Sequence, residues 1–315
     1  METKSSRESF FYLDSPRNNS FAVTSYLPPG KTPKGIVLII PGMAEHAGRY
    51  RDFACFLTKN GYGVYAGDHP GQGKTAGSPE MAGRISKRQN WQVMLENIRA
   101  LYTYIRKQQP EIPLFIMGHS MGSFLARNFA AMYPIYIRGL ILSGSFHLYR
   151  LPLRIFLAFI NLKILFEGTG KKSRWLNRLF YGNFNRHFKH APTLFEWISS
   201  DRKEVDAYEK DPYCGFYYSN GFYRHLLKGI ISTRKAESLL TYRKTLPILI
   251  LSGQEDPVGH FGKDAVIIHK EFYKQHFQNL SLKIFPGRHE LLHEKNKEEI
   301  YDYLLQWLDQ SLNVK

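Results

Sequence analysis

Cysteine, long apolar segments and acidic residues are all scarce in this sequence. The chain of 315 residues contains two cysteines, Cys55 and Cys214, which lie far apart. This spacing excludes a disulfide-stapled scaffold and a clustered metal site, and it predicts reduced thiols in a cytosolic protein. The N-terminal residues contain no uninterrupted apolar stretch of signal-peptide length, so we do not expect export.

The longest apolar segment is Leu151–Phe166, and Arg154 and Lys163 interrupt it. A helix that spans a bilayer needs about 20 consecutive apolar residues. We therefore expect no membrane-spanning segment.

Asp and Glu number 27 against 43 Lys and Arg, which gives a formal net charge of +16. A charge of this size favours anionic partners, either nucleic acid or acidic membrane lipid. Hydrophobic residues make up 43% of the chain and aromatic residues 15%, which predicts a folded globular protein. The length fits one large core with an insertion, or two modest domains.

Apolar runs alternate with amphipathic segments along most of the chain. Two runs, 10–13 and 21–27, flank a turn-rich connector and predict an antiparallel hairpin. Further strands are expected at 35–40, 63–66, 114–117, 139–142, 248–251 and 281–285, and helices at 50–59, 91–108, 122–132, 263–277 and 297–312. This order predicts an α/β fold with a mostly parallel sheet and helices on both faces.

The alternation breaks after Gly144, and residues 146–235 are aromatic, basic and helical in pattern. We predict a core formed by residues 1–145 and 236–315, with 146–235 as a helical lid or cap insertion. The insertion is expected over the C-terminal ends of the strands, where open α/β sheets bind ligands.

The segment Gly118-His119-Ser120-Met121-Gly122 fits G-x-S-x-G between a predicted strand and a predicted helix. The glycines permit a sharp turn that lifts the Ser120 hydroxyl above the sheet. The N–H of Met121, at a helix N-terminus, would then point toward a developing oxyanion. These features predict Ser120 as a nucleophile and His119 as a pocket or packing residue.

A nucleophilic serine needs a base, and the base needs an orienting acid. In this type of fold the chain order is serine, acid, histidine. Asp256 follows a predicted strand, and the Asp-Pro step favours it over its neighbour Glu255. The last predicted strand leads into His289, which we predict as the base, with His293 as the alternative.

The loop Pro41–His46 follows the strand at 35–40. Gly42 permits a close approach of the backbone, and the N–H of Met43 is the expected second oxyanion donor. The glycine-rich loop that begins at Asp68 lacks the spacing of a nucleotide-binding loop, so Asp68 is predicted to tie loops together.

The pair His289 and His293 is the nearest approach to a metal-ligand cluster, and it lacks H-E-x-x-H order. We therefore expect no zinc and no cofactor.

Five segments resemble the monoacylglycerol lipase and lysophospholipase branch of the α/β hydrolases, the serine aminopeptidase-type hydrolase family. They read PGMAEHAGRY, GDHPGQGKTAG, GHSMG, SGQEDPVG and FPGRHELLHE. The stretch SSDRKEVDAYEKDPYCGF is similar to the cap of bacterial members, and the likeness extends from about residue 20 to the C-terminus.

The resemblance implies an α/β-hydrolase fold and a triad of Ser120, Asp256 and His289, with the N–H groups of Met43 and Met121 as the oxyanion hole. The chain departs from the family at the oxyanion loop, where His-Gly is usual and Pro41-Gly42 stands here. The backbone donor of Met43 is unaffected by that change.

Residues 146–190 contain a single acid, Glu167, and are otherwise rich in basic and apolar side chains. The basic residues are Arg150, Arg154, Lys163, Lys171, Lys172, Arg174, Arg178, Arg186 and Lys189. An apolar face with basic flanks is typical of a helix on an anionic membrane surface or over a lipid pocket. The alternative is a lid helix that buries its apolar face on the core, and the two interpretations do not exclude each other. Nucleic acid is not expected, because no binding motif or base-stacking pattern is present.

Together these features predict an ester hydrolase that acts on a lipid-like acyl ester, a monoacylglycerol or a lysophospholipid, through an acyl-serine. One alternative is an aminopeptidase-like peptidase, which needs an acidic group for the substrate ammonium. Another is a catalytically silent binding protein with the same fold. We expect a cytoplasmic protein with peripheral contact at the membrane surface, and the sequence does not specify an oligomeric state.

Overall fold

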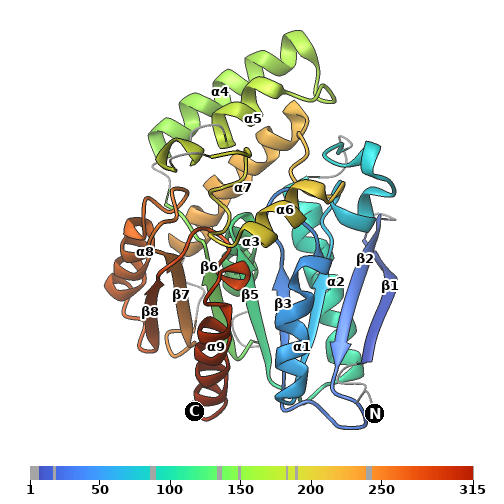
Figure 1. Cartoon of the computed structure of the whole chain (residues 1–315), viewed down its shortest axis with the longest axis vertical. Coiled ribbons are helices and arrows are strands. Elements are labelled where there is room, and N and C mark those ends of the chain that lie inside the picture. The colour runs from blue at the N-terminus through green and yellow to red at the C-terminus, as the bar shows by residue number, and fades with distance from the viewer. Residues whose placement is uncertain are drawn as a thin grey trace.

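The computed structural model contains one eight-stranded sheet with helices on both faces, as the sequence predicts (Figure 1). It describes residues 7–16, 19–85, 90–132, 137–147, 150–181, 184–188, 191–238 and 243–314. The strands are β1 (Arg7–Ser15), β2 (Asn19–Leu27), β3 (Gly35–Ile40), β4 (Tyr62–Gly67), β5 (Leu114–His119), β6 (Gly139–Ser143), β7 (Ile248–Gly253) and β8 (Leu280–Phe285).

The α-helices in the described ranges are α1 (Arg51–Lys59), α2 (Trp91–Gln108), α3 (Met121–Met132), α4 (Arg150–Glu167), α5 (Arg174–Tyr181), α6 (Arg202–Lys210), α7 (Asn220–Ser238), α8 (Lys263–Lys274) and α9 (Lys297–Leu312). Short 3₁₀ helices are η1 (Ala47–Tyr50), η2 (Gly73–Ala76), η3 (Pro79–Met81), η5 (Phe184–His187) and η6 (Leu291–His293).

The strand order is β1-β2-β4-β3-β5-β6-β7-β8. β1 and β2 pair antiparallel, β2 pairs antiparallel with β4, and the pairs from β4 to β8 are parallel. The hairpin is longer than the sequence predicts, because it runs from the pair Arg7–Leu27 to the pair Ser15–Asn19. Residues 17 and 18 of its predicted connector lie outside the described residues.

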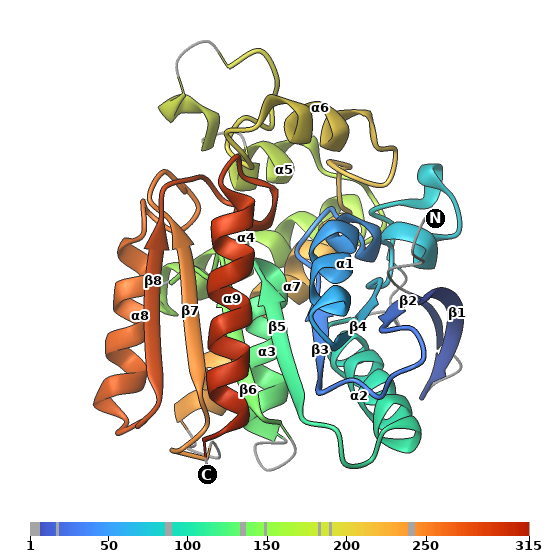
Figure 2. The same ribbon diagram turned by 60° about the horizontal axis from the view of Figure 1, so that its bottom comes forward.

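Helices cover the two faces of the sheet and create two hydrophobic cores (Figure 2). The alternating side chains of β3 divide between them. Leu38 packs toward α2, α3 and α8, whereas Val37 and Ile39 pack toward α1 and α9. Strands β3, β5, β6 and β7 are buried along their whole length. This burial explains their continuous apolar runs, since strands covered on both faces have no polar side.

Helices α4, α5 and α6 lie beyond the C-terminal ends of the parallel strands, and α7 leads back from them along α3 (Figure 1). Between β6 and β7 the described residues contain no strand, apart from an isolated bridge between Lys172 and Ser219. The boundaries of the insertion at 146 and 235 stay a prediction. Within the described ranges, no helix has both the length and the apolar character needed to cross a bilayer.

Candidate active site

Ser120 occupies the turn between β5 and α3, with a backbone φ of 49° in the left-handed region. Its N–H donates to the carbonyl of Ser143 at 2.9 Å, and its own carbonyl accepts from Ser123. A Cβ on Gly122 would lie 2.0 Å from the carbonyl oxygen of Ile40. The second glycine of the motif is therefore required because the first turn of α3 packs directly on the end of β3.

Asp256 follows β7 and is fully buried. Its Oδ2 lies 2.9 Å from Nδ1 of His289, and its Oδ1 accepts from the N–H of Val258. His289 follows β8 and is 2% exposed. Burial lowers the pKa of His289, but the charge and hydrogen bond of Asp256, together with the nearby charges of Glu290 and Glu45, outweigh it, so that the pKa is raised above its ordinary value. With Nδ1–H donating to Asp256, Nε2 is left as the base nitrogen.

Ser120 and His289 open onto the same cavity of about 290 Å³. Met43 and Met121 line it as well, together with Gly42 and His119 from the core. The helical segment, which is the part of the chain between β6 and β7, contributes Leu179, Phe184, Trp197, Tyr208 and Leu226. The ring of His119 lies 4.8 Å from that of His289 between centroids. Asp256 is bonded to His289 but is buried and does not itself line the cavity.

The two alternative triad residues occupy other environments. Glu255 is exposed. His293 is buried rather than at the surface, and its Nε2 lies 2.9 Å from the carbonyl of Arg49 while its Nδ1 faces Glu290. Both ring nitrogens of His293 are thus engaged away from the cavity.

Polar groups hold the loop after β3 that carries Met43. The Gly42 N–H donates to the Glu45 carboxylate, and Nε2 of Gln72 donates to the carbonyls of Gly42 and Glu45, each at 2.9 Å. Asp68 accepts from the N–H of Ala47, directly after this loop, and from that of Lys74, each at 2.8 Å. These two contacts agree with the prediction that Asp68 ties loops together.

A buried group of charges, which the sequence did not indicate, lies beside the cavity. The guanidinium of Arg49 pairs with Glu290, and both side chains are under 10% exposed. Burial raises the pKa of Glu290, but Arg49 and His293 together lower it more, so that it falls well below its usual range. Burial and the charge of Glu290 raise the pKa of Glu45. The residues stand in the motifs EHAGRY and FPGRHELLHE, but no spacing rule indicates that they meet.

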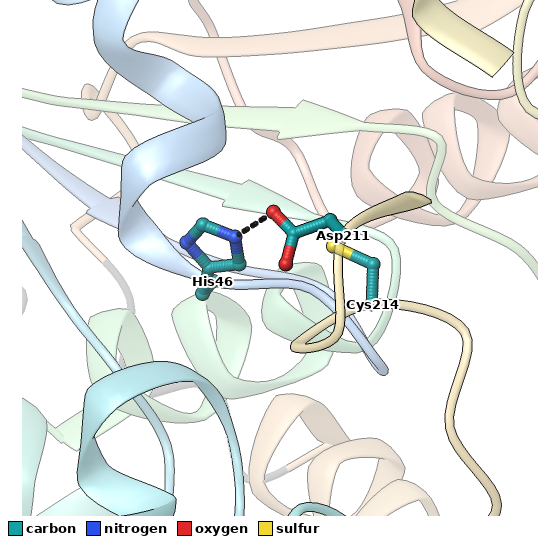
Figure 3. A group of neighbouring side chains, drawn as sticks. All are labelled: His46, Asp211 and Cys214. Carbon is teal, nitrogen blue, oxygen red and sulfur yellow. Dashed lines mark hydrogen bonds and ion pairs between the residues drawn. The ribbon is translucent and has the colours of Figure 1, made fainter. Parts of the chain in front are cut away.

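His46, Asp211 and Cys214 are the described residues that come closest to a metal-ligand cluster, with ligand atoms within 4.8 Å (Figure 3). Nε2 of His46 lies 2.8 Å from Asp211 Oδ2, and its Nδ1 accepts from the N–H of Gly48. Burial raises the pKa of the Cys214 thiol far above its ordinary value, which disfavours the thiolate that a metal needs. These contacts suit a link between the core and α6 better than a metal centre.

A second, larger cavity of about 810 Å³ lies beside the first and shares Leu179 and His260 with it. Its wall is mostly apolar and includes Leu153, Phe156 and Leu227.

Residues 31–296 match the model of a family described as serine aminopeptidase, S33. The monoglyceride lipase of Mus musculus is 27% identical over 274 residues, which cover 87% of this chain and 80% of that protein. The monoacylglycerol lipase of Mycolicibacterium smegmatis is 24% identical over 284 residues, which cover 89% of this chain and 90% of that protein.

Among solved structures, a highly thermostable carboxyl esterase from Bacillus coagulans is similar to this chain with a TM-score of 0.86 at 24% identity. The match covers 98% of this chain and 100% of the other. At this level of identity the likeness shows the fold, and it confirms the predicted α/β-hydrolase fold.

Proposed function

Because the chain belongs to the serine aminopeptidase S33 family, we propose that it is a serine hydrolase that cleaves carboxylic esters of lipid-like substrates. Monoacylglycerols and lysophospholipids are the substrate class. The observation that carries this proposal is the buried pair of Asp256 and His289, of which His289 opens together with Ser120 onto a largely apolar cavity. The relatives named as monoglyceride and monoacylglycerol lipases support it.

In the proposed reaction, the Ser120 hydroxyl attacks the ester carbonyl carbon while Nε2 of His289 takes its proton. Asp256 holds the imidazole in the required tautomer and stabilises the imidazolium. The N–H groups of Met43 and Met121 donate to the tetrahedral oxyanion. Collapse of this intermediate leaves an acyl-serine and releases the alcohol, which takes the proton from His289. Water then attacks the acyl-serine by the reverse proton route, and no cofactor takes part.

The acyl chain would lie against the apolar part of the cavity, formed by Leu179, Phe184, Trp197 and Leu226. The larger cavity continues past Leu179 and offers room for a longer chain. We therefore propose that lipid acyl groups, rather than short acyl groups alone, are accommodated.

Two acids line the cavity, and neither suits the ammonium group of an aminopeptidase substrate. Glu290 is paired with Arg49. Glu45 accepts from Gly42 N–H and from the Tyr50 hydroxyl, and burial raises its pKa. These contacts, together with the basic helical segment, favour the ester hydrolase over the peptidase.

We also propose peripheral contact with anionic membrane lipid through α4, in a cytoplasmic protein. One face of α4 packs inward through Leu153 and Ile160. The opposite face exposes Leu165 at 77% and Phe166 at 80%, and α4 lies on the side of the molecule farthest from the C-terminus (Figure 1). The packed inner face supports the interpretation as a lid, and the exposed outer face supports the proposed contact with a membrane surface. Of the nine basic residues in this segment, Lys189 lies outside the described residues.

A fluorophosphonate probe tests the chemistry, because it reacts with an activated serine. We expect the wild-type protein to be labelled and Ser120→Ala to be unlabelled and slower by several orders of magnitude. Hydrolysis of a monoacylglycerol, a lysophospholipid, p-nitrophenyl esters of graded length and an amino-acid arylamide then separates the substrate classes. Labelling of the Ser120→Ala variant by the fluorophosphonate, or faster hydrolysis of the arylamide than of the esters, would reject the proposal.

A further inference from the structure

Ala44, the residue after Met43, is held at both its backbone groups by the helical segment. Its N–H donates to the hydroxyl of Tyr218 at 3.0 Å. Its carbonyl accepts from the Tyr208 hydroxyl at 2.8 Å and from the N–H of Gly215 at 3.1 Å. Ala44 is 1% exposed and has φ of 59°, a conformation that a non-glycine residue keeps only when its surroundings impose it.

The peptide that carries the Met43 N–H is fixed from its other side. The carbonyl oxygen of Gly42 belongs to that peptide and accepts from Nε2 of Gln72. In a trans peptide the C=O and the N–H point in opposite directions. The bond from Gln72 therefore turns the Met43 N–H away from Gln72, and Met43 itself lines the cavity beside Ser120.

The direction of the Gln72 amide is in turn set by Tyr218. The hydroxyl of Tyr218 accepts from Ala44 and donates to Oε1 of Gln72. The reversed amide would place Oε1 against the two carbonyl oxygens of Gly42 and Glu45, which repel it. Gln72 and Tyr218 are both fully buried, so water does not replace these bonds.

We propose that Gln72 and Tyr218 are positioning residues that orient the Gly42–Met43 peptide as an oxyanion donor, a role that rests on the proposed function. Tyr218 lies in the helical segment, between α6 and α7. In this proposal the helical segment helps to stabilise the transition state, because it orients a backbone N–H donor that belongs to the core.

Two further contacts join the same parts of the chain. His46, two residues after Ala44, pairs with Asp211, which directly follows α6 (Figure 3). The guanidinium of Arg49 lies 4.9 Å from the ring centroid of Tyr208. The stretch from Tyr208 to Tyr218 thus contacts the oxyanion loop and the start of η1 at several places, which fixes Tyr218 relative to Gln72.

Tyr218→Phe and Gln72→Met, made in the full chain, test the role. An oxyanion donor contributes about 10²–10³-fold to kcat, and a misdirected donor retains part of that. We expect kcat to fall about tenfold to a hundredfold in each variant, with KM changed less than about twofold. Binding of a trifluoromethyl ketone, which forms an oxyanion on Ser120, should weaken in proportion to kcat. Binding of an ether analogue, which forms no oxyanion, should not change.

Tyr223→Phe is the matched control. Tyr223 is also fully buried in α7, and its hydroxyl donates to Asn177 rather than to the oxyanion loop. It should keep the wild-type ratio of ketone to ether binding. All rates are referred to the fraction of protein labelled by saturating fluorophosphonate. If Gln72→Met does not fold, Tyr218→Phe alone decides, since it loses a single hydroxyl.

Loss of ketone and ether binding by the same factor, or a Tyr218→Phe variant that behaves as Tyr223→Phe does, would overturn the positioning role and leave the hydrolase intact. Absence of ester turnover and of Ser120 labelling in the wild-type protein would overturn both proposals.

Discussion

Burial lowers the pKa of the His289 imidazole, whereas Asp256 and the nearby carboxylates raise it, and together the carboxylates prevail. Below its pKa the imidazole is protonated and is unable to accept the proton of Ser120. We predict that kcat/KM rises with pH through a midpoint above the ordinary value of about 6.5. A pH–rate profile on a neutral ester measures this midpoint directly, because such a substrate does not titrate.

Asp256→Asn is the control for that profile. The amide removes the charge that raises the pKa of His289 and favours the wrong tautomer, so kcat should fall by about 10⁴-fold. The residual activity should titrate at lower pH than the wild type. A midpoint that stays in place after the substitution would show that another group controls the profile.

The sequence predicts Ser120, Asp256 and His289 because each lies in the turn or loop that follows a strand, in an order that the chemistry requires. Their placement agrees with that prediction, and their roles stay a prediction until they are tested. Gln72 and Tyr218 were missed because they meet across 146 positions with no local signal. The same holds for Arg49 and Glu290, whose pairing depends on how two loops fold together.

Among the elements, the buried strands are predicted within one or two residues, since their apolar runs are continuous. β1 is longer than predicted because its exposure alternates along the strand, which leaves a weak apolar signal at its ends. Helix α4 has two sequence interpretations that do not exclude each other, since its sequence is apolar on more than one side. Its inner face packs on the core and its outer face is exposed, and the membrane-facing role stays a prediction.

The contact between α7 and α2 depends on Gly229. A Cβ there would lie 1.9 Å from Cδ2 of Trp91, a residue that is 6% exposed. Alanine ordinarily stabilises a helix by about 1 kcal/mol relative to glycine. Here we predict that Gly229→Ala lowers the free energy of unfolding by about 1–3 kcal/mol, because the ring has to move within packed surroundings. Thermal or urea unfolding measures the change.

Gly170→Ala is the comparison for that variant. A Cβ at Gly170 would meet nothing within 4 Å, and its φ lies outside the left-handed region. We expect stability within about 0.5 kcal/mol of the wild type. Equal stability of the two variants would show that the close approach of α7 to α2 is less tight than described.

For the whole molecule, the net charge of +16 and the exposed apolar face of α4 bear on the proposed membrane contact. We predict that the protein binds vesicles containing anionic lipid more tightly than neutral vesicles, and that salt weakens this preference. Co-sedimentation at low and high ionic strength gives the measurement.

The double variant Leu165→Ser, Phe166→Ser should reduce vesicle binding while leaving hydrolysis of a short, water-soluble ester unchanged, since both side chains point outward. Equal binding to anionic and neutral vesicles, or a double variant that binds as the wild type does, would reject a membrane-facing α4.

The order of strands and helices in the whole molecule was predictable, since alternation and motif order are properties of the sequence. The position of the helical segment over the strand ends followed from where the alternation breaks. The hydrogen bonds from the helical segment to the oxyanion loop were not predictable, because bonds between hydroxyls and loop backbone leave no periodic pattern in the sequence.

The bond from the Gly215 N–H to the carbonyl of Ala44 has a consequence for protein engineering. A chimera that exchanges the lids of two relatives to alter substrate range would ordinarily be joined at the ends of the insertion. In this protein such a junction also replaces the groups that hold Ala44. A graft that retains the native stretch from Tyr208 to Tyr218, and exchanges only α4 and α5, would change the wall of the cavities that these helices line. It would leave in place the hydrogen bonds that hold the oxyanion loop.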